Sequence, residues 1–155
     1  MAGWVAQVAR VPTEHGDWWM AWGDGGLVAC ARTRRDAGRR ARAAGATRVI
    51  PGTIRDVPAS PDWSLLPGGF RGRALRACHL IHRGEVITYA DLAARAGSPG
   101  AARAAGSAMA SNPLPVVIPC HRVVRSDGGL GEYSAGGTSA KRGMLVREGA
   151  LPPDA

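Results

Sequence analysis

The sequence of 155 residues contains only one lysine, Lys141, among its 20 basic residues, so arginine carries nearly all of its positive charge. Long apolar runs are also missing, because no stretch approaches the roughly 18 residues of a membrane span. The first residues lack the charged segment and apolar segment of a signal peptide. We therefore expect a cytoplasmic protein that does not enter a membrane.

Cysteines are few and odd in number, at positions 30, 78 and 120. This count and the wide spacing argue against a disulfide framework, and we expect at least one free thiol. The segment from Cys78 to His82 matches no zinc-binding spacing, and no second Cys/His cluster completes a ligand set. We expect no metal and no cofactor.

The net charge of +8 favours a polyanionic partner, with nucleic acid first. The positive charge has a competing explanation. Ala, Gly and Arg are abundant throughout the chain, as a GC-rich coding sequence would produce by itself. The arginines at 34, 35, 39, 40 and 42 ring a predicted helix instead of forming one stripe. A solvated helix face explains them better than phosphate contacts.

Residues 1–67 predict a small N-terminal scaffold domain, an antiparallel sheet with one helix. Trp4 to Val8 reads as a strand, and the runs 17–22 and 27–31 flank a Gly- and Asp-rich turn, as in a hairpin. Its tryptophans are interpreted as hairpin core. The helix spans residues 34–44, a short strand follows at 47–50, and a Pro- and Gly-rich linker ends the domain.

Residues 68–155 predict a mainly helical C-terminal domain, which makes the chain α/β, more specifically α+β. Helices are expected over 70–83, 89–96, 101–110 and 139–148, the second capped by Thr88. The two middle helices, joined by a turn at 97–100, form a helix-turn-helix pattern of winged-helix type.

The predicted helix 101–110 consists of small residues and a single arginine, Arg103. Small side chains allow close approach to a surface, and bulky polar side chains for reading base edges are missing. The helix therefore suits contact with DNA with little sequence readout. A tightly packed core helix explains the same composition equally well.

The segment Pro119–Val124 places a thiol, an imidazole and a guanidinium in succession at Cys120, His121 and Arg122. A short strand is expected before it, over 114–118. Neighbours on an extended segment point in opposite directions, so contact between Cys120 and His121 requires a turn or a bridging water. The Gly-rich segment 126–137 lacks a P-loop lysine and is interpreted as a mobile lid.

Four motifs together resemble the O6-alkylguanine-DNA alkyltransferase (methylated-DNA–protein-cysteine methyltransferase) family. They are Gly84–Tyr89, the Arg103-containing segment that ends at Asn112-Pro113, the block from Pro119 to Val123, and the loop from Gly131 to Gly137. The resemblance covers residues 69–149, and residues 1–67 only loosely resemble the family's N-terminal domain.

The resemblance implies a DNA-repair methyltransferase that acts once, moving an alkyl group from O6 of guanine, or from O4 of thymine, to its own Cys120. In that reading His121 acts as a base through a water and Glu148 orients it. Tyr89 protonates the leaving guanine, and Asn112 holds the active-site turn. Tyr133, Ser134 and Val123 line the pocket for the base.

The resemblance also implies a monomer that binds double-stranded DNA through the minor groove and flips the damaged base out of the helix. Arg103 fills the vacated stack. The other DNA-binding residues expected are Ala102, Ala104, Gly106, Thr88 and Arg122. The alternative is a non-catalytic, alkyltransferase-like protein that binds the lesion and flags it for another pathway; such relatives commonly replace the acceptor cysteine with tryptophan.

The interval from Tyr133 to Glu148 departs from the family pattern by one extra residue, with Ala135 as the insertion. A lengthened lid predicts room for bulkier alkyl groups. The family's adaptive-response members have a zinc-binding cysteine cluster that this sequence lacks, which agrees with the expectation of no metal.

Overall fold

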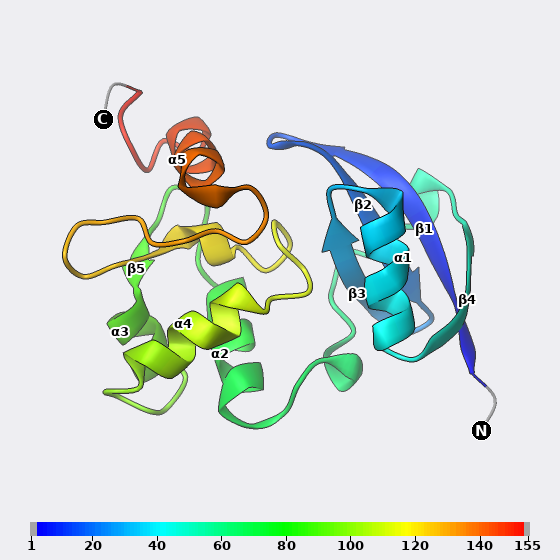
Figure 1. Cartoon of the computed structure of the whole chain (residues 1–155), viewed down its shortest axis with the longest axis horizontal. Helices are drawn as coiled ribbons and strands as arrows, with labels where there is room; N and C mark the ends of the chain where they lie inside the picture. Colours follow the sequence, from blue (N-terminus) through cyan, green and yellow to red (C-terminus); the bar gives the residue numbers. More distant parts are fainter. Residues whose placement is uncertain (1–2, 154–155) are drawn as a thin grey trace. The chain divides into compact units, whose positions relative to one another are not determined.

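The computed structural model of the protein describes residues 3–153, and the chain divides after Leu66 into two compact units (Figure 1). Each unit has its own elements. None of the helices formed by the described residues is both long and apolar enough to cross a membrane.

The first unit is a four-stranded sheet with the order β3-β2-β1-β4. Its strands are β1 (Trp4–Thr13), β2 (Gly16–Gly23), β3 (Gly26–Ala31) and β4 (Ala46–Pro51). The predicted hairpin is confirmed by the β2–β3 pairing, whose turn closes at Gly23 and Gly26. The strand β4 pairs in parallel with β1, since a helix crosses over between β3 and β4. The sheet is therefore mixed and not wholly antiparallel.

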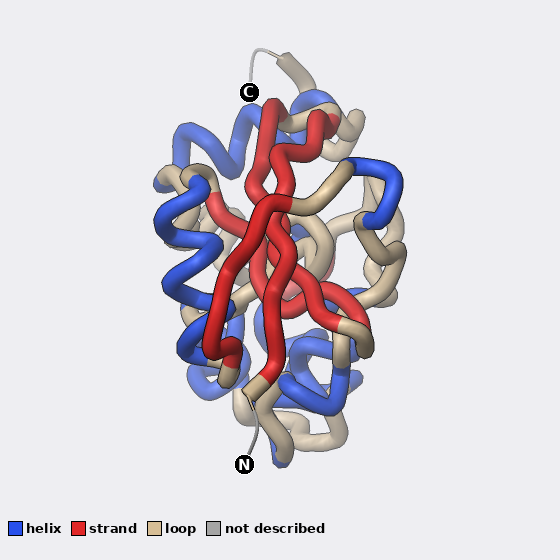
Figure 2. Tube along the Cα trace, turned by 90° about the vertical axis from the view of Figure 1, so that its right-hand side faces the viewer, coloured by secondary structure: helices blue, strands red, loops and turns tan. Residues whose placement is uncertain are grey.

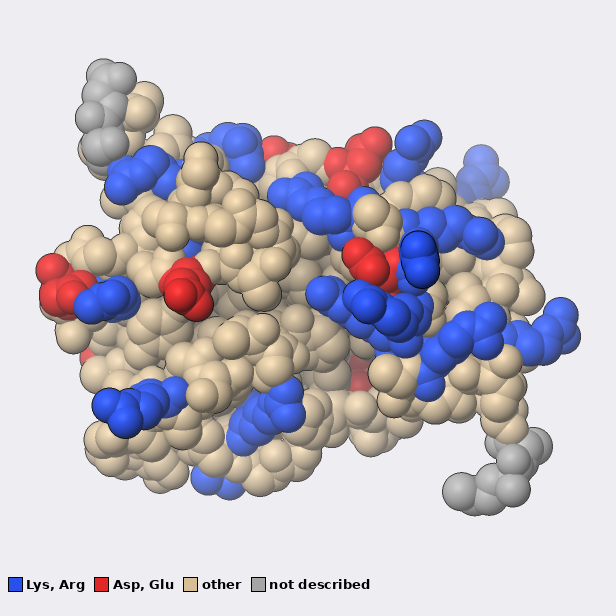
Figure 3. All heavy atoms as spheres, viewed as in Figure 1, with Lys and Arg blue, Asp and Glu red and all other residues tan. Residues whose placement is uncertain are grey.

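That crossover helix is α1 (Arg34–Ala43), which begins where the Thr33 side chain accepts a hydrogen bond from the Asp36 amide. Ala37 and Ala41 are fully buried against the sheet, and Figure 2 shows α1 along one face of the twisted strands. Lys and Arg side chains gather on the outer surface over this unit (Figure 3). Two helix arginines donate to backbone carbonyls, Arg40 to Cys30 and Arg42 to Thr47.

Two of the three hairpin tryptophans are confirmed as core residues, because Trp18 is fully buried and Trp22 nearly so, while Trp19 is partly buried and packs against the core. A linker with two short 3₁₀ turns, η1 (Ile54–Asp56) and η2 (Trp63–Leu65), completes the unit. The peptide of Asp62 returns to the sheet, where its amide donates to the Leu27 carbonyl at 2.8 Å.

The second unit contains α2 (Gly69–His79), α3 (Tyr89–Arg95), α4 (Ala102–Ala110) and α5 (Gly137–Arg147). The first of these ends at His79, four residues before the predicted end at Arg83, and the chain turns further on at Gly84, whose φ is 87°. Thr88 is confirmed as the cap of α3, since its hydroxyl accepts from the Asp91 amide at 3.1 Å.

The pair α3 and α4, joined by a turn, forms the predicted helix-turn-helix and packs on α2. The winged variant is not confirmed, because the two short strands of this unit, β5 (Ile87–Thr88) and β6 (Val123–Val124), pair in parallel. This pairing places the start of α3 beside the segment that follows Cys120.

The predicted strand over 114–118 is wrong, because the segment is a series of turns. Prolines at 113, 115 and 119 lack the amide donors that a strand needs. Val116 has a φ of 74°, which no other non-glycine residue in the described part of the chain shares in sign. A β-branched residue in this conformation is strained.

Candidate functional site

Cys120 opens a 3₁₀ turn, η3 (Cys120–Arg122), and is only 5% exposed. The sequence left open whether Cys120 lies on an extended segment or in a turn, and the structure shows a turn. The Arg122 amide donates to the Pro119 carbonyl at 2.9 Å, which closes the turn. The thiol thus sits on a bend between the turns that precede it and the strand β6.

The side chain of Asn112 holds the turns in front of the thiol. Its Nδ2 donates to the Ile118 carbonyl at 2.8 Å, and its Oδ1 accepts from the Leu114 amide at 2.9 Å. The residue is buried, so both bonds are shielded from water. This geometry agrees with the turn-holding role expected of Asn112 and fixes the strained segment around Val116.

His121 and Glu148 form a buried pair, with Nε2 and Oε2 2.9 Å apart and each side chain 1% exposed. Glu148 lies at the C-terminal end of α5, far from His121 in the sequence. The predicted contact between imidazole and carboxylate is therefore present. The Tyr133 ring meets the imidazole edge-on, with centroids 6.5 Å apart.

Arg122 completes this cluster from the other side of the carboxylate. Its Nε and Nη2 donate to the two oxygens of Glu148 at 2.9 and 2.8 Å, and its Nη1 donates to the Ile81 carbonyl at 2.7 Å. Only 14% of the side chain is exposed. These bonds leave little of the guanidinium for DNA, so the structure does not support the expected DNA contact and assigns Arg122 to holding Glu148.

Lys141 is the residue that the sequence reasoning missed. It lies on α5 and is fully buried, with Nζ 2.6 Å from the Val123 carbonyl and 3.4 Å from the Tyr89 hydroxyl. Burial lowers the pKa of Lys141 to about 8, against the opposing effect of nearby thiolates. Its rarity as the single lysine was the available signal, together with its spacing of two helical turns from Glu148.

Burial also raises the pKa of the Cys120 thiol, while a side-chain hydrogen bond from Asn112 and the charge of Lys141 act in the opposite direction. The pKa of Tyr89 is raised, first by burial and then by the neighbouring thiols Cys120 and Cys78 and by Glu132. Tyr89 therefore remains a protonated donor at neutral pH, and Cys120 depends on its surroundings to become a thiolate.

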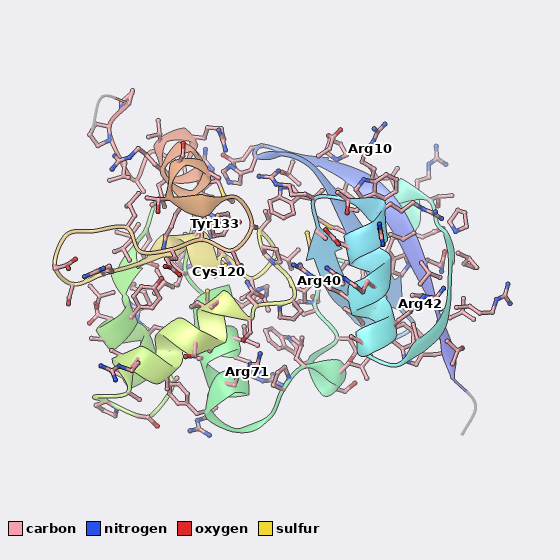
Figure 4. All side chains as sticks on the ribbon, viewed as in Figure 1. Arg10, Arg40, Arg42, Arg71, Cys120 and Tyr133 are labelled. Carbon is pink, nitrogen blue, oxygen red and sulfur yellow. The ribbon has the colours of Figure 1, made fainter. Side chains whose placement is uncertain are left out.

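A cavity of about 840 Å³ opens over the thiol. Figure 4 shows Cys120 between α4 and the loop that carries Tyr133, and Figure 3 shows the hollow between these two segments. Six of the predicted site residues line it: Tyr89, Arg103, Gly106, Cys120, Tyr133 and Ser134. Residues that the prediction did not include also line it, among them Ser107, Met109, Ala110, Arg125 and Glu132.

Other predicted residues stand apart from the cavity lining. Val123 is fully buried and offers its carbonyl to Lys141, not its side chain to the pocket. Thr88 uses its hydroxyl as a helix cap. Ala102 and Ala104 lie on α4 without lining the cavity, and Ala104 is exposed on the helix face opposite the buried Ala105.

The helix α4 has one packed face and one exposed face. Ala105, Ala108 and Met109 are buried, and α4 packs against α2 and α3. Arg103, Ala104, Ser107 and Ala110 form an exposed face of small residues with one arginine. The site thus belongs to a class of proteins in which a helix-turn-helix pair forms one wall of a cavity that holds a cysteine.

Comparison with known proteins specifies the class. The sequence profile described as "6-O-methylguanine DNA methyltransferase, DNA binding domain" matches residues 69–150, more than half of the chain. The chain belongs to this family.

Its relatives include the methylated-DNA–protein-cysteine methyltransferase of Rattus norvegicus, 59% identical over 70 residues, which are 45% of this chain and 34% of the relative. The enzyme of the same name from Methanothermobacter thermautotrophicus is 48% identical over 92 residues, which are 57% and 51% of the two chains. The chain thus matches between a third and a half of the length of these relatives.

The crystal structure of Mycobacterium tuberculosis O6-methylguanine methyltransferase is similar over 97% of this chain and 96% of that chain, with a TM-score of 0.68 and 24% identity. This likeness extends the shared fold to the N-terminal unit, whose sequence resembles the family only loosely.

Proposed function

We propose that the protein is a single-turnover DNA repair enzyme that transfers an alkyl group from O6 of guanine to Cys120. The observation that carries the proposal is the placement of one buried thiol in a cavity that also contains a phenol, Tyr89, and is bordered by the exposed face of α4. The names of the relatives describe methyl transfer from DNA to a protein cysteine.

The reaction begins with removal of the thiol proton. His121, held by Glu148, receives this proton through a water, and the charge of Lys141 favours the thiolate. The thiolate attacks the alkyl carbon, a carbon–sulfur bond forms, and the carbon–oxygen bond to guanine breaks. The electron pair remains on the guanine.

The leaving guanine then needs one proton, and the Tyr89 hydroxyl is the donor in the cavity. Its raised pKa keeps it protonated until guanine accepts. The nearby Lys141 ammonium, 3.4 Å from this hydroxyl, stabilises the tyrosinate that forms. The products are guanine and a stable thioether, so one protein molecule performs one repair.

The cavity is reached by an extruded nucleotide, because O6 of guanine in a duplex is stacked and inaccessible to a buried thiol. We propose that one monomer docks its small-residue α4 face in the minor groove, with Arg103 inserted where the base has left. Apart from Arg103, this face has no bulky polar side chain and no acidic one, which suits binding with little sequence preference.

The number of repairs per protein molecule tests the proposal. A duplex with O6-methylguanine in excess over protein is digested to nucleosides, and restored guanine is counted. The expected yield approaches one per protein and then stops. Continued turnover contradicts the single-use thioether, and bound but unrepaired DNA supports a non-catalytic lesion-binding protein instead.

A further inference from the structure

The cavity wall contains a cation that the transfer chemistry does not use, Arg125. Thr88 pairs with Val124 in the parallel β5–β6 ladder, so the next residues of the two segments, Tyr89 and Arg125, emerge side by side. Both line the cavity, and the charge of Arg125 acts on the Tyr89 phenol. This cation therefore stands next to the place where the substrate reacts.

The loop after Arg125 packs two glycines closely against the arginine stem. A methyl group at Gly131, where φ is 80°, would lie 3.0 Å from the Tyr89 hydroxyl oxygen and 3.5 Å from Cγ of Arg125. A methyl group at Gly129 would lie 3.5 Å from Cδ of Arg125. Because both positions are glycine, no loop side chain lies between the Arg125 stem and the Tyr89 phenol in the cavity wall.

Asp127 holds the guanidinium in the free protein, with Nη2 and Oδ2 2.5 Å apart. Figure 3 shows basic and acidic groups side by side at the tip of this loop. The loop also fixes Asp127, whose Oδ1 accepts from the Gly129 amide at 2.9 Å. That bond and the arginine lower the pKa of Asp127, so it stays charged.

The ion pair is exchangeable, because 60% of the Arg125 side chain and 55% of the Asp127 side chain are exposed. Exposed pairs of this kind contribute little to stability. Arg103 and Glu132 are the other charged side chains among the residues that line the cavity, and Lys141 lies behind Tyr89. Among the lining residues, Arg103 and Arg125 outnumber Glu132, so the mouth of the cavity suits a negatively charged group once Arg125 has left Asp127.

We propose that Arg125 receives an anionic group of the DNA substrate, exchanging Asp127 for it when the nucleotide enters the cavity. Two parts of a substrate supply this chemistry: a backbone phosphate beside the extruded nucleotide, and a carboxylate on the O6 substituent. The inference rests on the proposed function, since it takes the cavity as the site of an extruded nucleotide.

The test compares the full chain with Arg125→Ala, Arg125→Lys and Asp127→Asn. The control is Arg55→Ala, which removes the same charge from the exposed turn η1 of the other unit. Duplex affinity is measured at rising salt, and transfer rates are measured with duplexes carrying O6-methylguanine or O6-carboxymethylguanine and with free O6-benzylguanine.

For a phosphate, Arg125→Ala should weaken binding to both duplexes about tenfold relative to Arg55→Ala and reduce the log–log salt slope by about one. Arg125→Lys should recover part of the affinity, and Asp127→Asn should bind at least as tightly as the parent. The rate with the free base should fall by a smaller factor than the affinity for either duplex. For a carboxylated substituent, the loss should be confined to the O6-carboxymethylguanine duplex.

The inference is overturned if Arg125→Ala matches Arg55→Ala with both duplexes. It is also overturned if Asp127→Asn loses as much affinity as Arg125→Ala, because the pair would then serve only to shape the loop. Absence of transfer by the parent protein from every substrate contradicts the proposed function instead, and duplex affinity and its salt slope still decide the role of Arg125.

Discussion

Nε2 of His121 lies 2.9 Å from Oε2 of Glu148, and the same carboxylate binds the guanidinium of Arg122. One buried carboxylate thus orients the proposed base and neutralises a neighbouring cation. Because Glu148 caps the C-terminal end of α5 and the other two belong to η3, this cluster connects the last helix to the turn that carries the thiol.

Glu148→Gln should slow alkyl transfer about a hundredfold, since a neutral amide supports a protonated imidazole poorly. It should also lower the free energy of unfolding by about 3 kcal/mol, because Arg122 loses its counter-charge in a partly buried site. Single-turnover rates and urea unfolding measure the two effects. A folded variant that transfers at the parent rate would rule out the orienting role of Glu148.

Lys141→Met should displace the pH dependence of transfer. Burial raises the pKa of Cys120 and Lys141 counteracts it, so the thiolate is the minor form at pH 7 and the parent rate should increase as the pH rises above 7. Lys141 itself, with a pKa of about 8, is mostly charged at pH 7 and loses its charge as the pH passes 8. Without the cation, the climb should move to higher pH, with a lower rate at pH 7.

The profile of the methionine variant is measured with free O6-benzylguanine, so that DNA binding plays no part. Its melting temperature shows whether the fold is retained. A profile that coincides with that of the parent would mean that the charge of Lys141 does not act on the thiol.

Arg103→Ala should reduce transfer from a duplex far more than transfer from the free base, because only the duplex requires extrusion of the nucleotide. Loss of one inserted side chain is expected to cost about tenfold or more in the duplex reaction. Rates for the two substrates are compared directly. An equal fall for both would show that Arg103 supports the cavity instead of holding DNA open.

Deletion of Ala135 tests the length of the loop between Tyr133 and α5. This residue precedes Gly136, whose φ of 144° turns the chain into the helix. If the extra residue widens the cavity, the deletion should reduce transfer of benzyl groups more than transfer of methyl groups. Unchanged rates for both groups would show that the length of this loop does not determine which alkyl groups the cavity admits.

Local signals in the sequence predicted much of the fold. Thr88 before an amphipathic run predicted the start of α3, and the Gly-rich turn before Leu27 predicted the hairpin, because capping and turn chemistry depend on adjacent residues. The run 114–118 was wrong as a strand, since proline spacing outweighs apolar composition. The parallel pairing of β4 with β1 could not be predicted, because the alternation of apolar residues along a strand does not show which strand it pairs with or in which direction.

Tertiary partners explain what the sequence missed in the site. The roles of Lys141 and Arg122 come from the Val123 and Ile81 carbonyls and from Glu148, which lie in other segments of the chain. A buried lysine and a solvated one look the same in a sequence. The cysteine, histidine and glutamate were found because family motifs already combine segments that are distant along the chain.

The mass of the intact protein after incubation with a duplex containing O6-methylguanine tests the central claim most directly. The account predicts a gain of one methyl group on the parent chain, located at Cys120 by peptide mapping, and no gain on Cys120→Ser. An unchanged parent mass while the duplex remains bound, or a methyl group on another residue, would contradict it.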